Sequence, residues 1–158
     1  MLKNYLFAFE KCYGKYLSIC DSDDYWTDHK KLAKQVEFLE SNKDYVLSFH
    51  DAKKIDSNGR EIQNSIEDHI KRDLCFEDLS KAVYPLPTAS VLFRNDIGLE
   101  FPEVCKNGTN QDSFLFVLIS QFGKLHFQRN VGPSAYRIHA NGTWSSRTKL
   151  KKSLHSLE

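Results

Sequence analysis

The sequence predicts an α/β protein in which helices flank a mixed sheet, and three observations support this class. Segments with the composition of strands alternate with segments whose apolar residues recur at helical spacing. Strand-like segments then follow one another late in the chain, between residues 124 and 139. The 158 residues, of which 41% are hydrophobic, are enough for one domain with its own core. We therefore expect a single domain over residues 1–158, with a mixed sheet covered by helices.

Helical segments are recognised by the spacing of their apolar residues. The clearest helix is the segment 28–42, in which Leu32, Val36 and Leu39 form one apolar stripe. The segment 112–123 is apolar almost all round, which predicts a buried helix. Further helices are expected at three places: residues 2–14, 74–83 and 148–157.

Five segments are expected to be strands, because they are short, apolar and bounded by turn-forming residues. They are residues 15–20, 45–50, 88–94, 124–128 and 134–139. The segment "DSNGRE", after the second of these strands, has the composition of a turn. "YPLP" is expected to be an extended linker, since a residue that precedes proline is kept out of the α region.

The charge balance argues against nucleic acid as a partner. The chain carries 22 basic and 21 acidic residues, a net charge of +1, so no overall field attracts polyanions. Basic residues do gather in "RTKLKKSLH" near the C-terminus, which predicts a solvated helix face. A less favoured alternative is contact of this segment with anionic lipid headgroups or with a phosphorylated substrate.

The cysteines indicate a reducing compartment. Cys12, Cys20, Cys75 and Cys105 lie far apart, form no CxxC pair and have no zinc-ligand spacing with histidine. We expect them to be free thiols. No signal peptide is recognisable, and no apolar run reaches the roughly 18 residues of a membrane span. These features predict a cytoplasmic location, with peripheral contact to the inner face of the membrane as a further hypothesis.

The stretch "YLSICDSDDYW", residues 16–26, places three aspartates within four positions, directly after a predicted strand. One interpretation is an ordinary loop, because Asp and Ser form turns and cap the adjoining segment. An EF-hand calcium loop is excluded because Tyr25 and Trp26 occupy its fifth and sixth positions. A phosphatase with an aspartate nucleophile is disfavoured, because Tyr25 stands where Thr or Val is usual.

A divalent cation accounts best for these acids. Three neighbouring carboxylates repel one another unless a cation is present, so an ordinary loop leaves their energetic cost unexplained. The oxygens of Asp21 and Asp23 suit Mg²⁺ or Mn²⁺, which share the rest of their coordination shell with phosphate oxygens. The carboxyl end of a strand in an open α/β sheet is also where ligands bind. The pattern therefore predicts a cation that bridges a diphosphate.

A longer set of motifs resembles one enzyme family. The segment "GKYLSICDSDDYWTDHKKLAKQVEFLESNKDYVLSFHDAKKIDSNG" is similar to the central part of the family 2 glycosyltransferases, which have the GT-A fold. "PTASVLF", "NQDSFLFVLISQFGKLHF" and "AYRIHANGTWS" resemble later parts of that family in the same order, over about residues 4–147 in all. The resemblance implies the metal- and acceptor-side part of a GT-A fold. It also implies inverting transfer of a sugar from a nucleotide-sugar to an acceptor hydroxyl.

The resemblance assigns roles to four acids. Asp21 and Asp23 would hold Mn²⁺ or Mg²⁺ and, through it, the diphosphate of the nucleotide-sugar donor. Asp24 would contact sugar hydroxyls or support the loop, and capping of the next turn is an equal alternative. Asp112 would be the catalytic base for the acceptor hydroxyl, although its spacing also fits an N-cap. The family often has Glu before this acid, where the present chain has Gln111.

The resemblance also suggests residues outside these acids that would contact the donor or the acceptor. In "YRIH", His139 would contact the metal or the leaving diphosphate, and Arg137 is expected in the same donor-binding part of the site. Trp26 and Trp144 would either stack on sugar faces or pack as core aromatics. A weaker hypothesis gives the acceptor side to the two residues after the second strand, His50 and Asp51.

The resemblance also predicts a missing part. In the family an N-terminal βαβ portion of roughly 30 residues or more holds the nucleotide, whereas only 15 residues precede Tyr16. The strand 15–20 would then keep one edge unpaired, which predicts self-association through that edge. The alternative is that the helix 2–14 folds over the same surface.

Two hypotheses about function remain open. One is a glycosyltransferase, active or inactive as this chain stands, whose acceptor is a saccharide or a lipid-linked saccharide of bacterial polysaccharide assembly. The other is a non-catalytic carbohydrate-binding or assembly module derived from such an enzyme. A metal-dependent phosphohydrolase is the least favoured hypothesis.

Overall fold

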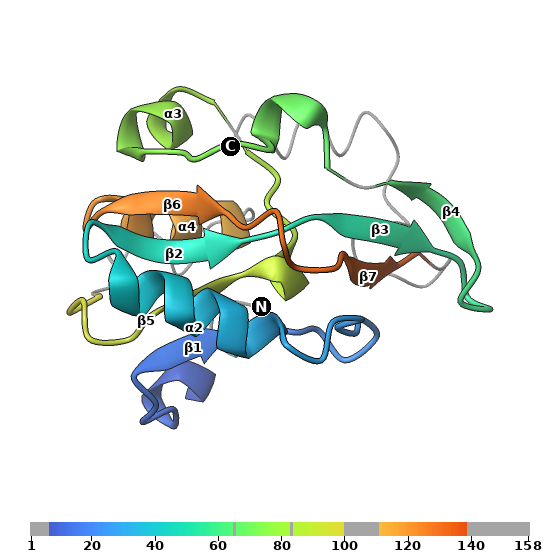
Figure 1. Ribbon diagram of the computed structural model, residues 1–158, viewed down its shortest axis with the longest axis horizontal. Helices are drawn as coiled ribbons and strands as arrows, with labels where there is room; N and C mark the ends of the chain where they lie inside the picture. The colour runs from blue at the N-terminus through green and yellow to red at the C-terminus, as the bar shows by residue number, and fades with distance from the viewer. Residues whose placement is uncertain (1–6, 65, 83, 100–110, 139–158) are drawn as a thin grey trace.

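The computed structural model describes residues 7–64, 66–82, 84–99 and 111–138, and it confirms a mixed sheet flanked by helices (Figure 1). One sheet has the strand order β1-β5-β2-β6. Its members are β1 (Tyr16–Ser18), β2 (Tyr45–Phe49), β5 (Leu92–Arg94) and β6 (Lys124–Phe127). β5 runs antiparallel to β1 and β2, and β2 runs parallel to β6. The carboxyl ends of β1, β2 and β6 therefore lie at the same edge of the sheet.

A second sheet continues from that edge, with the order β4-β3-β7. It consists of β3 (Ala52–Ile55), β4 (Glu61–Asn64) and β7 (Ser134–Arg137). β3 and β4 form an antiparallel hairpin around the predicted "DSNG" turn, in which Gly59 has a φ of 82°. β7 lies parallel to β3 and also bridges to Tyr25. The sequence did not predict β3 and β4, because their polar residues lack the pattern of a half-buried strand.

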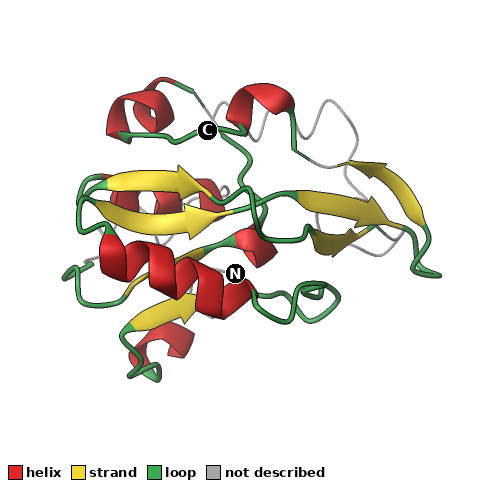
Figure 2. Cartoon of the chain, in the orientation of Figure 1, coloured by secondary structure: helices red, strands yellow, loops and turns green. Residues whose placement is uncertain are grey.

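Helices cover both faces of the four-stranded sheet. On one face α2 (Lys31–Ser41) packs against β2 and β5, and on the other α4 (Gln111–Ser120) lies behind β2 and β6 (Figures 1 and 2). α3 (Phe76–Lys81) packs beside α4. The core between these layers contains side chains with 0% exposure, among them Leu47, Phe49, Ile119 and Leu125. Burial of such apolar surface is the main stabilising contribution to the fold.

Several predicted helices and strands are shorter in the structure, because local hydrogen bonds form turns at their starts. The helix expected at 28–42 begins at Lys31, because the Asp28 carboxylate accepts a bond from the Lys30 N–H (2.8 Å) and forms a turn first. The strand expected at 88–94 begins at Leu92. It is preceded by the 3₁₀ turn η2 (Thr88–Ser90), in which the Ser90 N–H and Oγ both donate to the Pro87 carbonyl.

The remaining helix predictions have mixed outcomes. The helix expected at 74–83 is limited to α3, and the buried helix expected at 112–123 is α4, which ends at Ser120. The helix expected at 2–14 is described only as a helical turn over residues 7–10. The helix expected at 148–157 lies outside the described residues.

β1 forms one edge of the four-stranded sheet, as the sequence predicted for the strand 15–20. Its apolar side chains are nevertheless covered within the chain, since Leu17 and Ile19 are each 8% exposed. Phe9, from the helical turn before β1, packs edge-to-face on Phe93 with ring centroids 5.9 Å apart. This contact places the leading segment against β5, and both self-association through the β1 edge and coverage of that edge by the leading segment stay predictions.

Candidate functional site

The acidic loop, defined as residues 20–25, leaves the sheet at the carboxyl end of β1. The Asp24 N–H donates to the Asp21 carbonyl (3.1 Å), which makes a tight turn inside the loop. Asp21 and Asp23 are both exposed at the surface, whereas Asp24 is half-buried. The strand-end position predicted from the sequence is therefore confirmed for all three acids.

β7 holds this loop in place, although it lies more than a hundred residues later in the chain. Tyr25 and Ala135 exchange two backbone hydrogen bonds, with N···O distances of 3.2 and 2.9 Å. The Asp24 carboxylate accepts a bond from the Arg137 N–H (2.9 Å), and the Arg137 Nε donates to the Asp23 carbonyl (3.0 Å). The loop is thus fixed by backbone pairing and by one guanidinium.

The guanidinium of Arg137 also reaches the β3–β4 turn. Its Nη1 donates to the carbonyls of Asp56 (3.0 Å) and Ser57 (3.3 Å). These bonds give Arg137 and Asp24 a visible role in supporting the loop, one of the alternatives considered for Asp24. A contact of either side chain with a donor stays a prediction, and His139 and Trp144 lie outside the described residues.

The charge of Asp112 acts on the acidic loop. Partial burial raises the pKa of the Asp21 carboxyl, and the charges of Asp23 and Asp112 raise it further. Burial raises the pKa of Asp24 to about 6; a hydrogen bond from the Arg137 N–H opposes this, and the charges of Asp23 and Asp21 add to it. A cation beside Asp21 and Asp24 would offset the repulsion that raises the pKa values of these two carboxyls.

Tyr136 lies among these acids, and the sequence alone did not single it out. Burial raises the pKa of its hydroxyl, and the charges of Asp24, Asp23, Asp21 and Asp112 raise it further. The side chain comes from β7, next to the Ala135 bridge to the acidic loop. A signal was present in "SAYRIH", since a strand that pairs with the acidic loop carries Tyr136 into the site.

Asp112 stands in the first turn of α4, as the second residue of the helix. Its Oδ1 accepts a bond from the Ser113 N–H (2.9 Å). The position is one residue inside the helix, so Asp112 is not the residue that precedes it as an N-cap. A helix N-terminus favours negative charge, which suits a carboxylate that must accept a proton.

The structure also places three other candidates. His50 is 1% exposed, so it does not line an open acceptor surface as the weaker hypothesis required. Asp51, beside it, forms an ion pair with Lys71 at 3.2 Å. Trp26 donates its indole N–H to the Ala89 carbonyl (2.8 Å), which agrees with packing against the protein.

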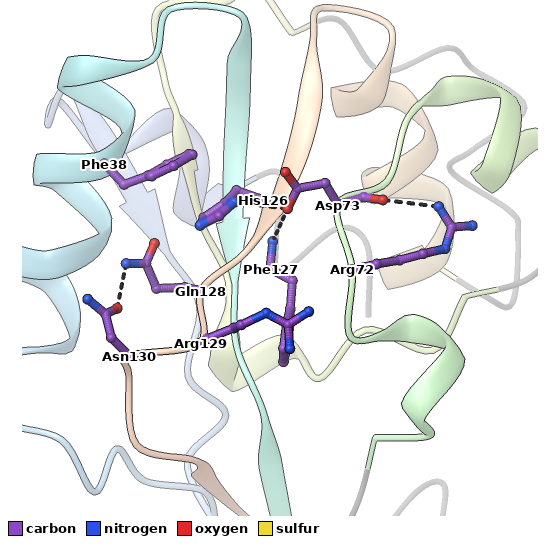
Figure 3. Close-up of a pocket in the computed structure, with 8 residues that line it drawn as sticks. All are labelled: Phe38, Arg72, Asp73, His126, Phe127, Gln128, Arg129 and Asn130. Carbon is purple, nitrogen blue, oxygen red and sulfur yellow. Dashed lines mark hydrogen bonds and ion pairs between the residues drawn. The ribbon is translucent and has the colours of Figure 1, made fainter.

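A cavity of about 690 Å³ lies where Phe38 of α2 faces the residues around β6, and none of the predicted site residues lines it (Figure 3). Asp73 organises it: its Oδ1 accepts bonds from the Phe127 N–H and the His126 ring, both at 2.9 Å. The His126 ring stacks on Phe38 with centroids 3.6 Å apart. The remaining lining residues are Arg72, Gln128, Arg129 and Asn130.

No group of three or more His, Cys, Asp or Glu side chains in the described ranges is arranged to hold a metal ion. The predicted cation site would offer two protein carboxylates, Asp21 and Asp23, and Mg²⁺ sites commonly complete their shell with substrate and water. Among the helices within the described part of the chain, none is both long and apolar enough to cross a membrane.

Comparison with known proteins agrees with the fold. The mixed sheet between helices, with acids at a strand end, is consistent with the class of proteins that have a GT-A-like fold. A sequence model described as glycosyl transferase family 2 matches residues 2–97. The chain belongs to glycosyl transferase family 2.

Curated relatives share most of this chain. Uncharacterized proteins from Mycobacterium tuberculosis and Mycobacterium bovis are each 30% identical to it over 133 residues. The aligned part is 84% of this chain and 37% of each relative. The chain thus spans little more than a third of the length of the relatives it matches.

Proposed function

We propose that the chain contributes to the metal-dependent transfer of a sugar from a nucleotide-sugar to an acceptor hydroxyl. The observation that carries the proposal is the group of Asp21, Asp23 and Asp24 directly after the carboxyl end of β1, where the charge of Asp112 also raises the pKa of Asp21. Family membership supports the same reaction class. The acceptor would be a saccharide or a lipid-linked saccharide, met at the cytoplasmic face of the membrane.

The proposed roles follow from the chemistry of each group. Mn²⁺ or Mg²⁺ held by Asp21 and Asp23 would supply Lewis-acid stabilisation for the departing nucleoside diphosphate. Asp112 would remove the proton of the acceptor hydroxyl while that oxygen forms a bond to the anomeric carbon. The bond from the anomeric carbon to the diphosphate oxygen breaks at the same time, so the configuration at that carbon inverts.

The cation site can be tested by titrating the chain with Mn²⁺ in the presence of UDP. The double variant Asp21→Ala, Asp23→Ala should bind at least about tenfold more weakly, because it loses both proposed protein ligands. The variant Glu67→Ala, Asp68→Ala is a matched control, because it removes two exposed acids far from the loop. Equal binding by the wild-type chain and the loop variant would refute the cation assignment.

The base can be tested separately with Asp112→Asn. Release of UDP from UDP-sugars should fall by about 10²–10⁴-fold, because one positioned base contributes about that much. Binding of Mn²⁺ with UDP should stay within about twofold, since Asp21 and Asp23 are intact. A variant that retains most of its turnover would remove Asp112 from the mechanism. Binding of saccharide by a wild-type chain without any transfer would instead support the carbohydrate-binding module.

A further inference from the structure

Lys31, the first residue of α2, is a fully buried lysine close to the acidic loop. Its side chain is 1% exposed, and it is among the largest buried side chains of the described residues. Its Nζ donates to the Ser18 Oγ (3.0 Å) and to the Val91 carbonyl (3.4 Å). No carboxylate in the described ranges forms an ion pair with it.

The groups around this amine lie at both ends of the acidic loop. Ser18 ends β1, two residues before the loop begins, and its Oγ also donates to the Val91 carbonyl (2.6 Å). Trp26 follows the loop directly, and its ring centroid is 4.5 Å from the Lys31 Nζ. The indole N–H is fixed by the Ala89 carbonyl. One buried amine therefore contacts a residue before the acidic loop and a residue after it.

This arrangement costs stability, so packing alone does not explain it. Burial lowers the pKa of Lys31 to about 7, which shows that the charged amine is unfavourable where it lies. An apolar side chain of similar volume is commonly neutral or stabilising at such a position. His50 offers no compensation, because burial lowers its pKa to about 4 and the charge of Lys31 lowers it further.

We propose that Lys31 is a positioning residue that joins the two ends of the acidic loop and thereby keeps Asp21 and Asp23 at the spacing a cation requires. The amine bonds to Ser18 before the loop and attracts the face of Trp26 after it, an interaction of the cation–π type when it is protonated. The consequence for metal binding rests on the proposed function.

The test compares Lys31→Met with Lys30→Met, which changes the neighbouring exposed lysine. Lys31→Met should weaken the binding of Mn²⁺ with UDP about tenfold, the lower end of what supporting residues contribute. Its melting temperature should equal or exceed that of the wild-type chain, because a buried amine is replaced by an apolar side chain. Lys30→Met should change neither quantity. Unchanged affinity in Lys31→Met, or affinity and melting temperature that fall together, would overturn the proposal.

A second measurement does not depend on the metal. In metal-free protein, the amide hydrogens of Asp24 and Tyr25 should exchange at least about tenfold faster in Lys31→Met, while those of Leu47 and Leu125 are unchanged. Equal exchange in the loop would overturn the positioning role. If the wild-type chain binds no Mn²⁺, the proposed function fails, and the exchange data still decide on Lys31. If Lys31→Met does not fold, Ser18→Ala takes its place with amide exchange as the criterion: faster exchange of Asp24 and Tyr25 with unchanged exchange of Leu47 and Leu125 supports the positioning role, and equal exchange overturns it.

Discussion

Replacing Lys31 with methionine should remove a dependence of stability on pH. The pKa of this lysine falls from 10.5 to about 7 on folding because the amine is buried. Between these two values the unfolded chain binds more protons than the folded chain, so the free energy of unfolding rises with pH. The rise amounts to about 1 kcal/mol per pH unit, or about 2 kcal/mol between pH 7 and pH 9.

The assay is urea denaturation of the wild-type chain and Lys31→Met at pH 7, 8 and 9. The two free energies of unfolding are subtracted at each pH, so groups common to both proteins cancel. The advantage of the variant should shrink by about 2 kcal/mol over this interval, because only the wild-type chain gains stability from the lysine. A difference that stays constant from pH 7 to pH 9 would show that the amine is protonated normally in the folded chain, and the argument from burial would be wrong.

Two further substitutions test the surroundings of the site and the sheet. Asp24→Asn should stabilise the chain by about 2 kcal/mol at pH 7.5 and by less at pH 5 in urea denaturation. The pKa of Asp24, raised to about 6, makes the folded state lose stability as pH rises through that value, while Asn can still accept the Arg137 bond. A less stable variant at both pH values would contradict this. Gly123→Ala should cost about 1–3 kcal/mol in thermal unfolding, since its Cβ would meet the Asp44 carbonyl at 2.7 Å. Gly132→Ala, with its nearest atom at 3.4 Å, is the control, and equal losses would refute the steric argument.

The elements with strong local patterns were predictable from the sequence. The helix at Lys31–Ser41 has an apolar stripe, and the strand at Tyr45–Phe49 is apolar almost throughout. The strands at Ala52–Ile55 and Glu61–Asn64 were not predicted, because charged and polar residues interrupt their apolar positions and leave no regular alternation. Their pairing depends on the partner strand, and that partner is not visible in local composition.

In the candidate site, too, only the residues with a local sequence pattern were predictable. Asp21, Asp23 and Asp24 were recognisable because they are close together in the sequence and repel one another. Tyr136 was not, since only the pairing of β7 with the acidic loop brings it to these acids. Lys31 resembles its neighbour Lys30 in the sequence, and only burial distinguishes the two lysines.

The attachment of the acidic loop to β7 has a consequence for the order in which the molecule folds. The bond between Asp24 and Arg137 joins residues 113 positions apart, so it forms only after nearly all of the described chain is in place. During synthesis Asp24 therefore leaves the ribosome 113 residues ahead of its partner Arg137. A cation that requires the finished loop would bind the native chain and not its folding intermediates. Its binding would therefore mark the completion of folding and stabilise only that state.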